Sequence, residues 1–219
     1  MNLDWSIVPA SAGALARGAL ITIALTVLTM MIAVPCGIGV AMLRESRLRP
    51  VAFLATCFVE LFRNLPIILV VYWAFYVMPV VFGIAFSPFL TGLVALSLNN
   101  TAYNSETFRS GIKSIRRGQT EAALALGMSE AQAFRKIVLP QAWRRVLPVL
   151  ATTWVTLFKD TSLVSVIAVG DLAHTAMQIR SQSFRVIEML TAMAAIYWLL
   201  GYPQAKIADW IHKKFGVTE

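Results

Sequence analysis

Long apolar stretches separated by short polar segments dominate the 219-residue chain. About twenty apolar residues in a helix are enough to cross the hydrocarbon core of a bilayer. The pattern therefore predicts five membrane-spanning helices, with approximate bounds 14–43, 51–82, 88–112, 146–169 and 186–208. The expected fold class is an all-α membrane protein, in which residues 1–219 form a single transmembrane domain.

Composition and charge agree with this pattern. Hydrophobic residues make up 58% of the chain and charged residues only 14%, whereas about a quarter of an average soluble domain is charged. The net charge of +8 does not indicate nucleic-acid binding, because the basic residues gather in alternate connections between the apolar stretches. Such an excess marks the cytoplasmic side of a membrane protein. We therefore expect the N-terminus outside, the C-terminus inside, and a cytoplasmic loop at about 113–145.

The sequence offers no framework for catalysis or metal binding. Its two cysteines, Cys36 and Cys57, lie inside apolar stretches, where buried thiols usually act as inert packing residues. No GxxxxGK[ST] loop is present to cradle nucleotide phosphates. We expect no catalytic residue, metal ligand or cofactor in this chain, so any energy from ATP has to come through a partner.

A polar interruption divides the fourth apolar stretch. Lys159, Asp160, Thr161 and Ser162 follow about thirteen apolar residues, which are too few to cross a bilayer as one helix. The sequence thus predicts a helix broken at membrane depth, with its polar break facing a cavity or another subunit. Lys159 would favour a carboxylate there, and Asp160 would favour an ammonium group or cap the next half-helix. The alternative is a self-contained ion pair that only satisfies the break.

The third apolar stretch carries polar residues on one helical face. Asn99, Tyr103 and Glu106 follow one another at helical spacing. One interpretation makes them a polar wall of a substrate path. The other makes them helix–helix contacts, with a Glu106–Arg109 ion pair near the inner surface.

The second apolar stretch also contains ionisable residues. Glu60 and Arg63 are three residues apart and can pair with each other on a helix. A role for them in a gate or a cavity wall is the alternative to this structural pair.

The segment 121–140 is charged and amphipathic, unlike the rest of the chain. Residues 121–126 are strong helix formers, and Gly127 supplies the left-handed residue that commonly ends a helix. Ser129 then begins a second helix as its N-cap, and Gln132 completes a capping box. Pro140 is expected to stop the second helix. The prediction is two short helices joined by a tight elbow and exposed to water.

The spacing of this segment resembles the EAA motif of ABC-importer permeases. The matching residues are Glu121, Ala122, Ala123, Gly127, Ile137, Leu139 and Pro140. Stretches at 60–69 (ELFRNLPIIL), 102–115 (AYNSETFRSGIKSI) and 157–167 (LFKDTSLVSVI) resemble the permease subunits of polar amino acid ABC importers. DWSIVP near the N-terminus and KDTSLVSVIAVGDL resemble a glutamate/aspartate permease most.

The resemblance implies a type I ABC-importer fold in the bacterial inner membrane, with five spans around a two-fold axis. It implies a second permease subunit, identical or homologous, and a periplasmic or lipid-anchored amino-acid-binding protein. It also implies two ATPase subunits that bind ATP and Mg. The matched EAA residues would dock into the ATPase subunit, with Glu121 as a charge partner. Asn99 and residues 159–162 would border the substrate cavity.

Two other classes of protein compete with this interpretation. An ion-coupled secondary transporter also uses broken helices and membrane-level charges, but it has no need of the elbow and commonly shows inverted repeats. An intramembrane enzyme needs a nucleophile and base or a metal site at one depth, and neither histidine lies in a predicted span.

Overall fold

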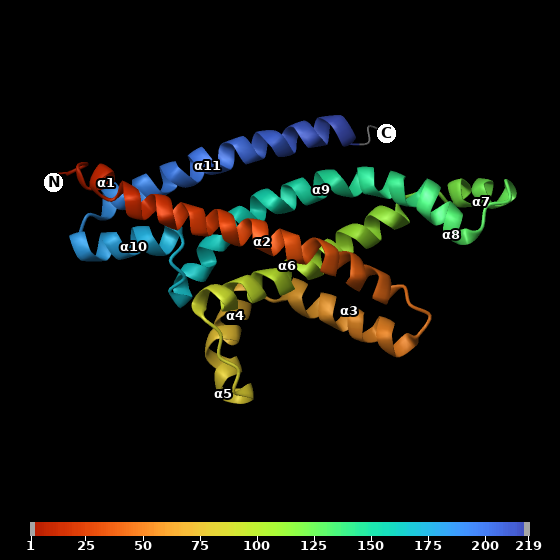
Figure 1. Cartoon of the computed structure of the whole chain (residues 1–219), viewed down its shortest axis with the longest axis horizontal. Coiled ribbons are helices and arrows are strands. Elements are labelled where there is room, and N and C mark those ends of the chain that lie inside the picture. The colour runs from red at the N-terminus through yellow and green to blue at the C-terminus, as the bar shows by residue number, and fades with distance from the viewer. Residues whose placement is uncertain (1–2, 217–219) are drawn as a thin grey trace.

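The computed structural model describes residues 3–216 of the chain, and in this part every regular element is helical (Figure 1). Two helices are long and apolar enough to cross a membrane unaided, α2 (Ala12–Arg44) and α11 (Val186–Phe215). A single turn, α1 (Ile7–Ala10), precedes α2. Helix α2 follows the predicted bounds closely, whereas α11 begins as predicted but continues past 208 to Phe215.

The second predicted span is not one helix. The chain forms α3 (Arg49–Asn64) and then a second arm bent by 108° from it. This arm consists of α4 (Ile67–Tyr72), a π-helical turn η1 (Trp73–Val77) and α5 (Met78–Phe82). Pro66 causes the bend, because a proline disfavours the helical conformation in the residue before it. Leu65 is accordingly extended, with φ −92° and ψ 133°.

At the predicted break the fourth span changes from α-helix to 3₁₀ helix without interruption, and the chain bends only after Ile167. The helical chain passes through α8 (Glu130–Ala133), a π-helical turn η2 (Phe134–Val138) and α9 (Leu139–Asp160). Directly after Asp160 it tightens into the 3₁₀ segment η3 (Thr161–Ile167). The outer segment that follows forms a further helix, α10 (Leu172–Ser183), at 47° to the preceding arm.

Helix α6 (Pro88–Lys113) runs through the middle of the molecule and packs most extensively against α2 (Figure 1). Gly37 of α2 permits this close approach, because a Cβ atom at that position would lie 2.7 Å from Cβ of Asn104. The helix is about 39 Å long at 1.5 Å per residue, which is enough to cross a bilayer. Its many polar side chains are buried against neighbouring helices: Thr91, Ser97, Asn99, Asn100, Thr101, Asn104 and Ser105.

These polar residues make α6 too hydrophilic to qualify as a span by composition. Within the described residues, two helices qualify alone, and up to four spans result if each bent pair counts as one. The prediction of five spans therefore depends on α6.

The apolar core surrounds the break after Asp160. Leu25, Val71, Leu96, Leu157 and Val164 come from five different elements and are almost fully buried in one cluster. Tight packing of this kind holds helices together in lipid, where the hydrophobic effect between helices is weak. The core thus fixes the break relative to α6.

One of the smaller expectations from the sequence, the burial of the cysteines, is wrong. Cys36 and Cys57 are free but exposed on the outer surface of the helices rather than buried, since their helix faces have no neighbour within the chain. The elements expected on the cytoplasmic side, α7 (Arg117–Ala125) and α8, lie at one end of the molecule near the end of α2, while α1 and α10 lie at the other (Figure 1).

Candidate functional site

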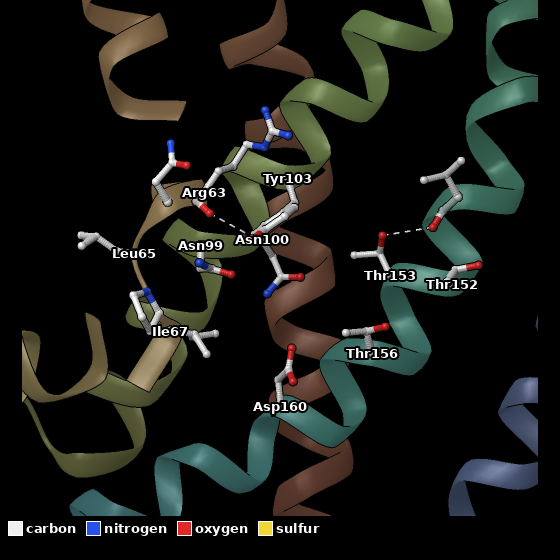
Figure 2. A pocket seen from close by; sticks show the side chains of 13 residues that line it. Arg63, Leu65, Ile67, Asn99, Asn100, Tyr103, Thr152, Thr153, Thr156 and Asp160 are labelled. Atoms are coloured by element: carbon white, nitrogen blue, oxygen red, sulfur yellow. Dashed lines mark hydrogen bonds between the residues drawn. The ribbon is translucent and has the colours of Figure 1, made fainter. Parts of the chain in front are cut away.

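A cavity of about 520 Å³, lined by both polar and apolar side chains, opens beside the end of α9. Its walls come from the end of α3, the α3–α4 bend, the middle of α6 and one face of α9 (Figure 2). The lining residues are Arg63, Asn64, Leu65, Pro66, Ile67, Asn99, Asn100, Tyr103, Val149, Thr152, Thr153, Thr156 and Asp160. Amides, hydroxyls, one cation and one anion are set in a lining that is more apolar than polar in area.

The wall between α3 and α6 is held by Asn99. Its side-chain nitrogen donates to the carbonyl of Phe62 over 2.8 Å. That carbonyl would normally accept the N–H of the residue four positions later, but this residue is Pro66 and has none. Tyr103 adds a hydroxyl donation to the carbonyl of Arg63 over 3.3 Å. Asn99 therefore both joins two helices and lines the cavity, so the two roles considered from the sequence are not exclusive.

The α9 wall carries a row of hydroxyls that ends at Asp160 (Figure 2). Thr152 and Thr153 donate to carbonyls one turn earlier in α9, and Thr156 lies between them and Asp160. Asp160 is partly buried and interacts electrostatically with the adjacent Lys159. Adjacent residues on a helix do not face one another, so this neighbour leaves the carboxylate directed at the cavity.

The other residues of the break lie outside this cavity. Lys159 is exposed and is not among the lining residues. Thr161 is fully buried, and its hydroxyl donates to the carbonyl of Phe158 over 2.7 Å. Ser162 donates to the carbonyl of Lys159 over 2.7 Å. Of the five residues predicted to border a substrate path, Asn99 and Asp160 therefore share the cavity, while Lys159, Thr161 and Ser162 do not line it.

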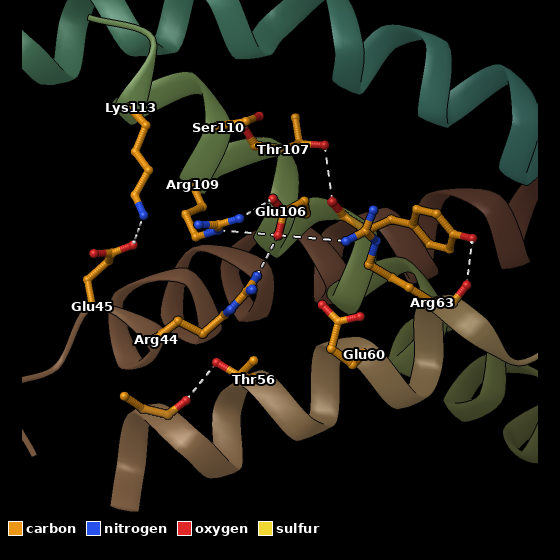
Figure 3. Close-up of polar contacts among 12 residues, drawn as sticks. Arg44, Glu45, Thr56, Glu60, Arg63, Glu106, Thr107, Arg109, Ser110 and Lys113 are labelled. Carbon is orange, nitrogen blue, oxygen red and sulfur yellow. Dashed lines mark hydrogen bonds and ion pairs between the residues drawn. The ribbon is translucent and has the colours of Figure 1, made fainter. Parts of the chain in front are cut away.

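A charged cluster adjoins the cavity and centres on Glu106 (Figure 3). Nη1 of Arg44 lies 2.6 Å from Oε2 of this carboxylate, and Nη2 of Arg109 lies 2.5 Å from Oε1. The Glu106–Arg109 pair expected from the sequence is thus present. Arg44 could not be anticipated, because it comes from the end of α2, 62 residues away.

The expected Glu60–Arg63 pair is not formed. Nη1 of Arg63 lies 3.7 Å from Oε2 of Glu106 instead (Figure 3), and the Glu60 carboxylate accepts a hydrogen bond from Asn64 over 3.2 Å. The physical reason is the packing of α3 on α6, which offers Arg63 a carboxylate that lies on another helix.

The elbow predicted between α7 and α8 has the predicted cap. Gly127 is left-handed, with φ +81°. Its N–H donates to the carbonyl of Leu124, and the N–H of Met128 donates to the carbonyl of Ala123. These two hydrogen bonds form a complete Schellman motif. Glu121 and Ala122 are exposed on α7, whereas Ala123 is buried.

The second half of the elbow begins with the predicted capping box. Gln132 N–H donates to the Ser129 hydroxyl over 3.3 Å, and Ser129 N–H donates to the Gln132 side chain over 2.9 Å. The elbow also exposes large apolar side chains, and Leu126 is 80% exposed. Sequence reasoning did not single out Leu126, although an apolar residue beside a turn glycine was a usable signal.

The predicted stop at Pro140 is wrong, because the helix continues through it as α9. A proline clashes with the carbonyl four residues earlier and cannot donate to it. The π-helical turn Phe134–Val138 directly before α9 widens the helix there, which makes room for the proline ring. Ile137 and Leu139 therefore lie within one long helical arm, and this arm joins the elbow to the cavity.

Metal ligation has no candidate in residues 3–216, where no group of three or more His, Cys, Asp or Glu side chains is close enough to hold an ion. The geometry is instead that of a cavity connected by a helical arm to an exposed elbow.

Comparison with known proteins identifies the family of the chain. Residues 33–217 match the family model described as "Binding-protein-dependent transport system inner membrane component". The glutamate/aspartate import permease protein GltK of Escherichia coli O6:H1 is 34% identical over 220 residues, covering 97% of this chain and 98% of that protein. The arginine transport system permease protein ArtQ of Bacillus subtilis is 32% identical over 200 residues, covering 91% of each.

Solved structures give the same result. A chain of a crystal structure of an amino acid ABC transporter with histidines superposes with a TM-score of 0.92 at 30% identity, covering 98% of this chain and 100% of that one. The MetNI methionine ABC transporter has the same fold, with a TM-score of 0.74 at 20% identity, covering 95% of this chain and 99% of that one. The chain belongs to the family of inner membrane components of binding-protein-dependent transport systems.

Proposed function

We propose that this chain is the permease subunit of an ATP-driven importer that carries a polar amino acid across the bacterial inner membrane, with glutamate and aspartate as the first candidates. The observation that carries the proposal is the cavity beside the broken helix, which presents Arg63 and Asp160 at opposite ends of a wall of amides and hydroxyls. Every amino acid bears a carboxylate and an ammonium group, and the cavity offers a partner for each.

The substrate path is proposed to run between α6 and α9. Asn99 and the threonine hydroxyls of α9 replace the water that a polar solute loses on entering the membrane. Asp160 is the partner for the ammonium group. Lys159, Thr161 and Ser162 act in this proposal by shaping the break that fixes Asp160, because their own contacts lie outside the cavity.

Energy is proposed to enter through the elbow. The matched motif residues Glu121, Ala122, Ala123 and Gly127 lie on or next to α7, with exposed Leu126 beside them. An ATPase subunit that carries ATP and Mg is the proposed occupant of this surface. The arm from Glu130 to Asp160 is helical throughout, so a displacement of the elbow is transmitted along it to the cavity.

The proposed topology has five spans, with the N-terminus outside and the C-terminus inside. Helix α6 is taken as the fifth span, since polar side chains inside a membrane are tolerated where they face other helices or a cavity. The end of the molecule that bears the elbow also bears Arg44, Arg116 and Arg145, and an excess of basic residues marks the cytoplasmic side.

Three further partners complete the proposal: a second permease subunit, identical or homologous, a second ATPase subunit, and a periplasmic or lipid-anchored amino-acid-binding protein. The second arm of the bent pair supports the pairing, because Trp73, Tyr76 and Val80 are exposed on it. The chain itself is proposed to be non-catalytic.

Uptake into proteoliposomes tests this function against an ion-coupled secondary transporter. The chain is reconstituted with and without its ATPase subunit, and uptake of radiolabelled amino acids is measured with ATP or with a sodium or proton gradient. We expect uptake only when the ATPase subunit, ATP and the binding protein are all present. Uptake driven by an ion gradient alone would refute the proposal.

A further inference from the structure

Arg63 is the one cationic side chain among the residues that line the cavity. It lies in the last turn of α3, directly before the 108° bend. In Figure 2 it lies at the opposite end of the labelled group from Asp160, with Asn99 and Asn100 between them. The bend at Pro66 therefore places a guanidinium group at one end of the cavity and leaves a carboxylate at the other.

The guanidinium of Arg63 is not fully used by the protein. Both oxygens of Glu106 are taken at short range by Arg44 and Arg109. Arg63 reaches the same carboxylate only at 3.7 Å, which is beyond a hydrogen bond. Its Nε atom is buried and has no hydrogen-bond partner among the described residues.

The remaining contact of Arg63 orients it without satisfying its donors. Cζ of Arg63 lies 5.8 Å from the centroid of the Tyr103 ring, which is within the range of a cation–π contact. Such a contact holds the plane of the guanidinium but accepts none of its N–H groups. Nε is shielded from the cavity, so the donors that a ligand carboxylate would meet are the Nη groups, whose contact with Glu106 is as long as 3.7 Å.

We propose that Arg63 binds the α-carboxylate of the transported amino acid in this cavity, while Asp160 faces its ammonium group. This inference rests on the proposed function and adds to it the residue that recognises the acid group. A guanidinium offers paired donors that match the two oxygens of a carboxylate. Glu106 contributes by binding Arg44 and Arg109 at short range, and Arg63 is the one arginine of the cluster that also lines the cavity.

The rival interpretation is that Arg63 only stabilises the Glu106 cluster. Two matched variants separate the alternatives. Arg63→Gln removes the guanidinium from the cavity, and Glu106→Gln weakens the cluster but leaves Arg63 in place. Arg63→Lys keeps the charge and loses the paired donors. Co-purification with the ATPase subunit shows that each variant folds.

The measurement is equilibrium binding to the purified permease–ATPase complex without the binding protein. The probes are tritiated L-glutamate, L-aspartate, L-glutamine and L-arginine, and the competitor is the α-carboxamide of whichever of these the wild type takes up. In the wild type we expect the carboxamide to bind about tenfold or more weakly than the acid, because hydrogen bonds to charged groups are the stronger ones. In Arg63→Gln we expect the two affinities to become equal.

Glu106→Gln should retain the wild-type ratio of affinities, and Arg63→Lys should retain part of it. The proposal would be overturned if Arg63→Gln kept the wild-type ratio of the affinities for acid and carboxamide. It would also be overturned if Glu106→Gln lost as much of this ratio as Arg63→Gln. A wild-type complex that takes up none of the four amino acids with ATP would instead refute the proposed function, which distinguishes the two failures.

Discussion

The side chain of Asn99 donates to the Phe62 carbonyl in place of the N–H group that Pro66 lacks. This hydrogen bond joins α3 to α6 and so fixes the cavity wall between them. The carbonyl of Phe62 would otherwise have no hydrogen-bond donor within the helix. The same residue then has its other amide atoms beside the cavity. A side chain that both bonds to a neighbouring helix and lines the cavity gives α6 a structural reason to carry polar residues.

Replacement of Asn99 by leucine should destabilise the permease. The variant Asn99→Leu leaves the Phe62 carbonyl unsatisfied, which costs about 1–3 kcal/mol. The matched control is Asn100→Leu, because Asn100 donates to the carbonyl of Leu96, which already accepts an N–H within α6. Thermal unfolding in detergent should show a clearly larger loss for Asn99→Leu, and equal losses would contradict the role given to Asn99.

At the scale of elements, the long arm of α8, η2 and α9 is the connection between the elbow and the cavity. Its rigidity depends on the π-helical turn that accommodates Pro140. The elbow at its start depends on Gly127, whose φ of +81° is costly for an L-residue with a side chain. Because the elbow is well defined and the arm is continuous, we expect a displacement of the elbow to be transmitted along the arm to the cavity.

Gly127→Ala should loosen the elbow. The added Cβ meets no atom within 4 Å, so the cost is conformational and amounts to roughly 1–2 kcal/mol. Hydrogen exchange of the amides of α7 and α8 should accelerate by about 5- to 30-fold, with ATP-driven uptake reduced in parallel.

Gly118→Ala is the control for that experiment. Gly118 also has open space around its Cβ position, but it lies within α7 and takes no positive φ. Alanine is the better helix former there, so exchange should slow or stay unchanged. Faster exchange in both variants would mean that the left-handed conformation is not what matters.

At the scale of the whole molecule, the chain separates two surfaces along its long axis. The elbow and the end of α2 lie at one end, and α1 and α10 lie at the other (Figure 1). The cavity is lined by α3, α6 and α9. The inner-membrane family to which the chain belongs works with binding proteins, and this arrangement offers one end to each proposed partner.

Glu121→Lys should weaken association with the ATPase subunit without affecting insertion of the chain. Charged contacts across an interface are worth about 1.5 kcal/mol or more, so we expect about a tenfold loss of affinity in titrations of the detergent-solubilised permease. Asp209→Lys makes the same change of charge at an exposed site on α11 and should leave the affinity unchanged. Wild-type affinity in Glu121→Lys would contradict the docking role of α7.

Prediction from the sequence succeeded for features that depend on neighbours along the chain. The left-handed Gly127 and the capping box of Ser129 and Gln132 follow from local backbone chemistry, and the structure has them. At the predicted break after Asp160 the structure has a change to 3₁₀ helix, and the bend itself follows Ile167. The Glu106–Arg109 pair is of the same kind, since three residues separate its members on one helix.

Prediction failed where packing between distant segments decided the outcome. Arg63 pairs with Glu106 rather than Glu60, and Lys159 is exposed beside the cavity lined by Asp160. Pro140 does not end its helix, because a widened turn accommodates it.

The sequence by itself determined the membrane class, the broken helix and the elbow, because hydrophobic length, capping and glycine conformation are local properties of the chain. Only the tertiary structure decided which charges face the cavity. The physical reason is that the direction of a side chain and the identity of its partner depend on how α3, α6 and α9 pack, and helix packing is not encoded in any short window of residues.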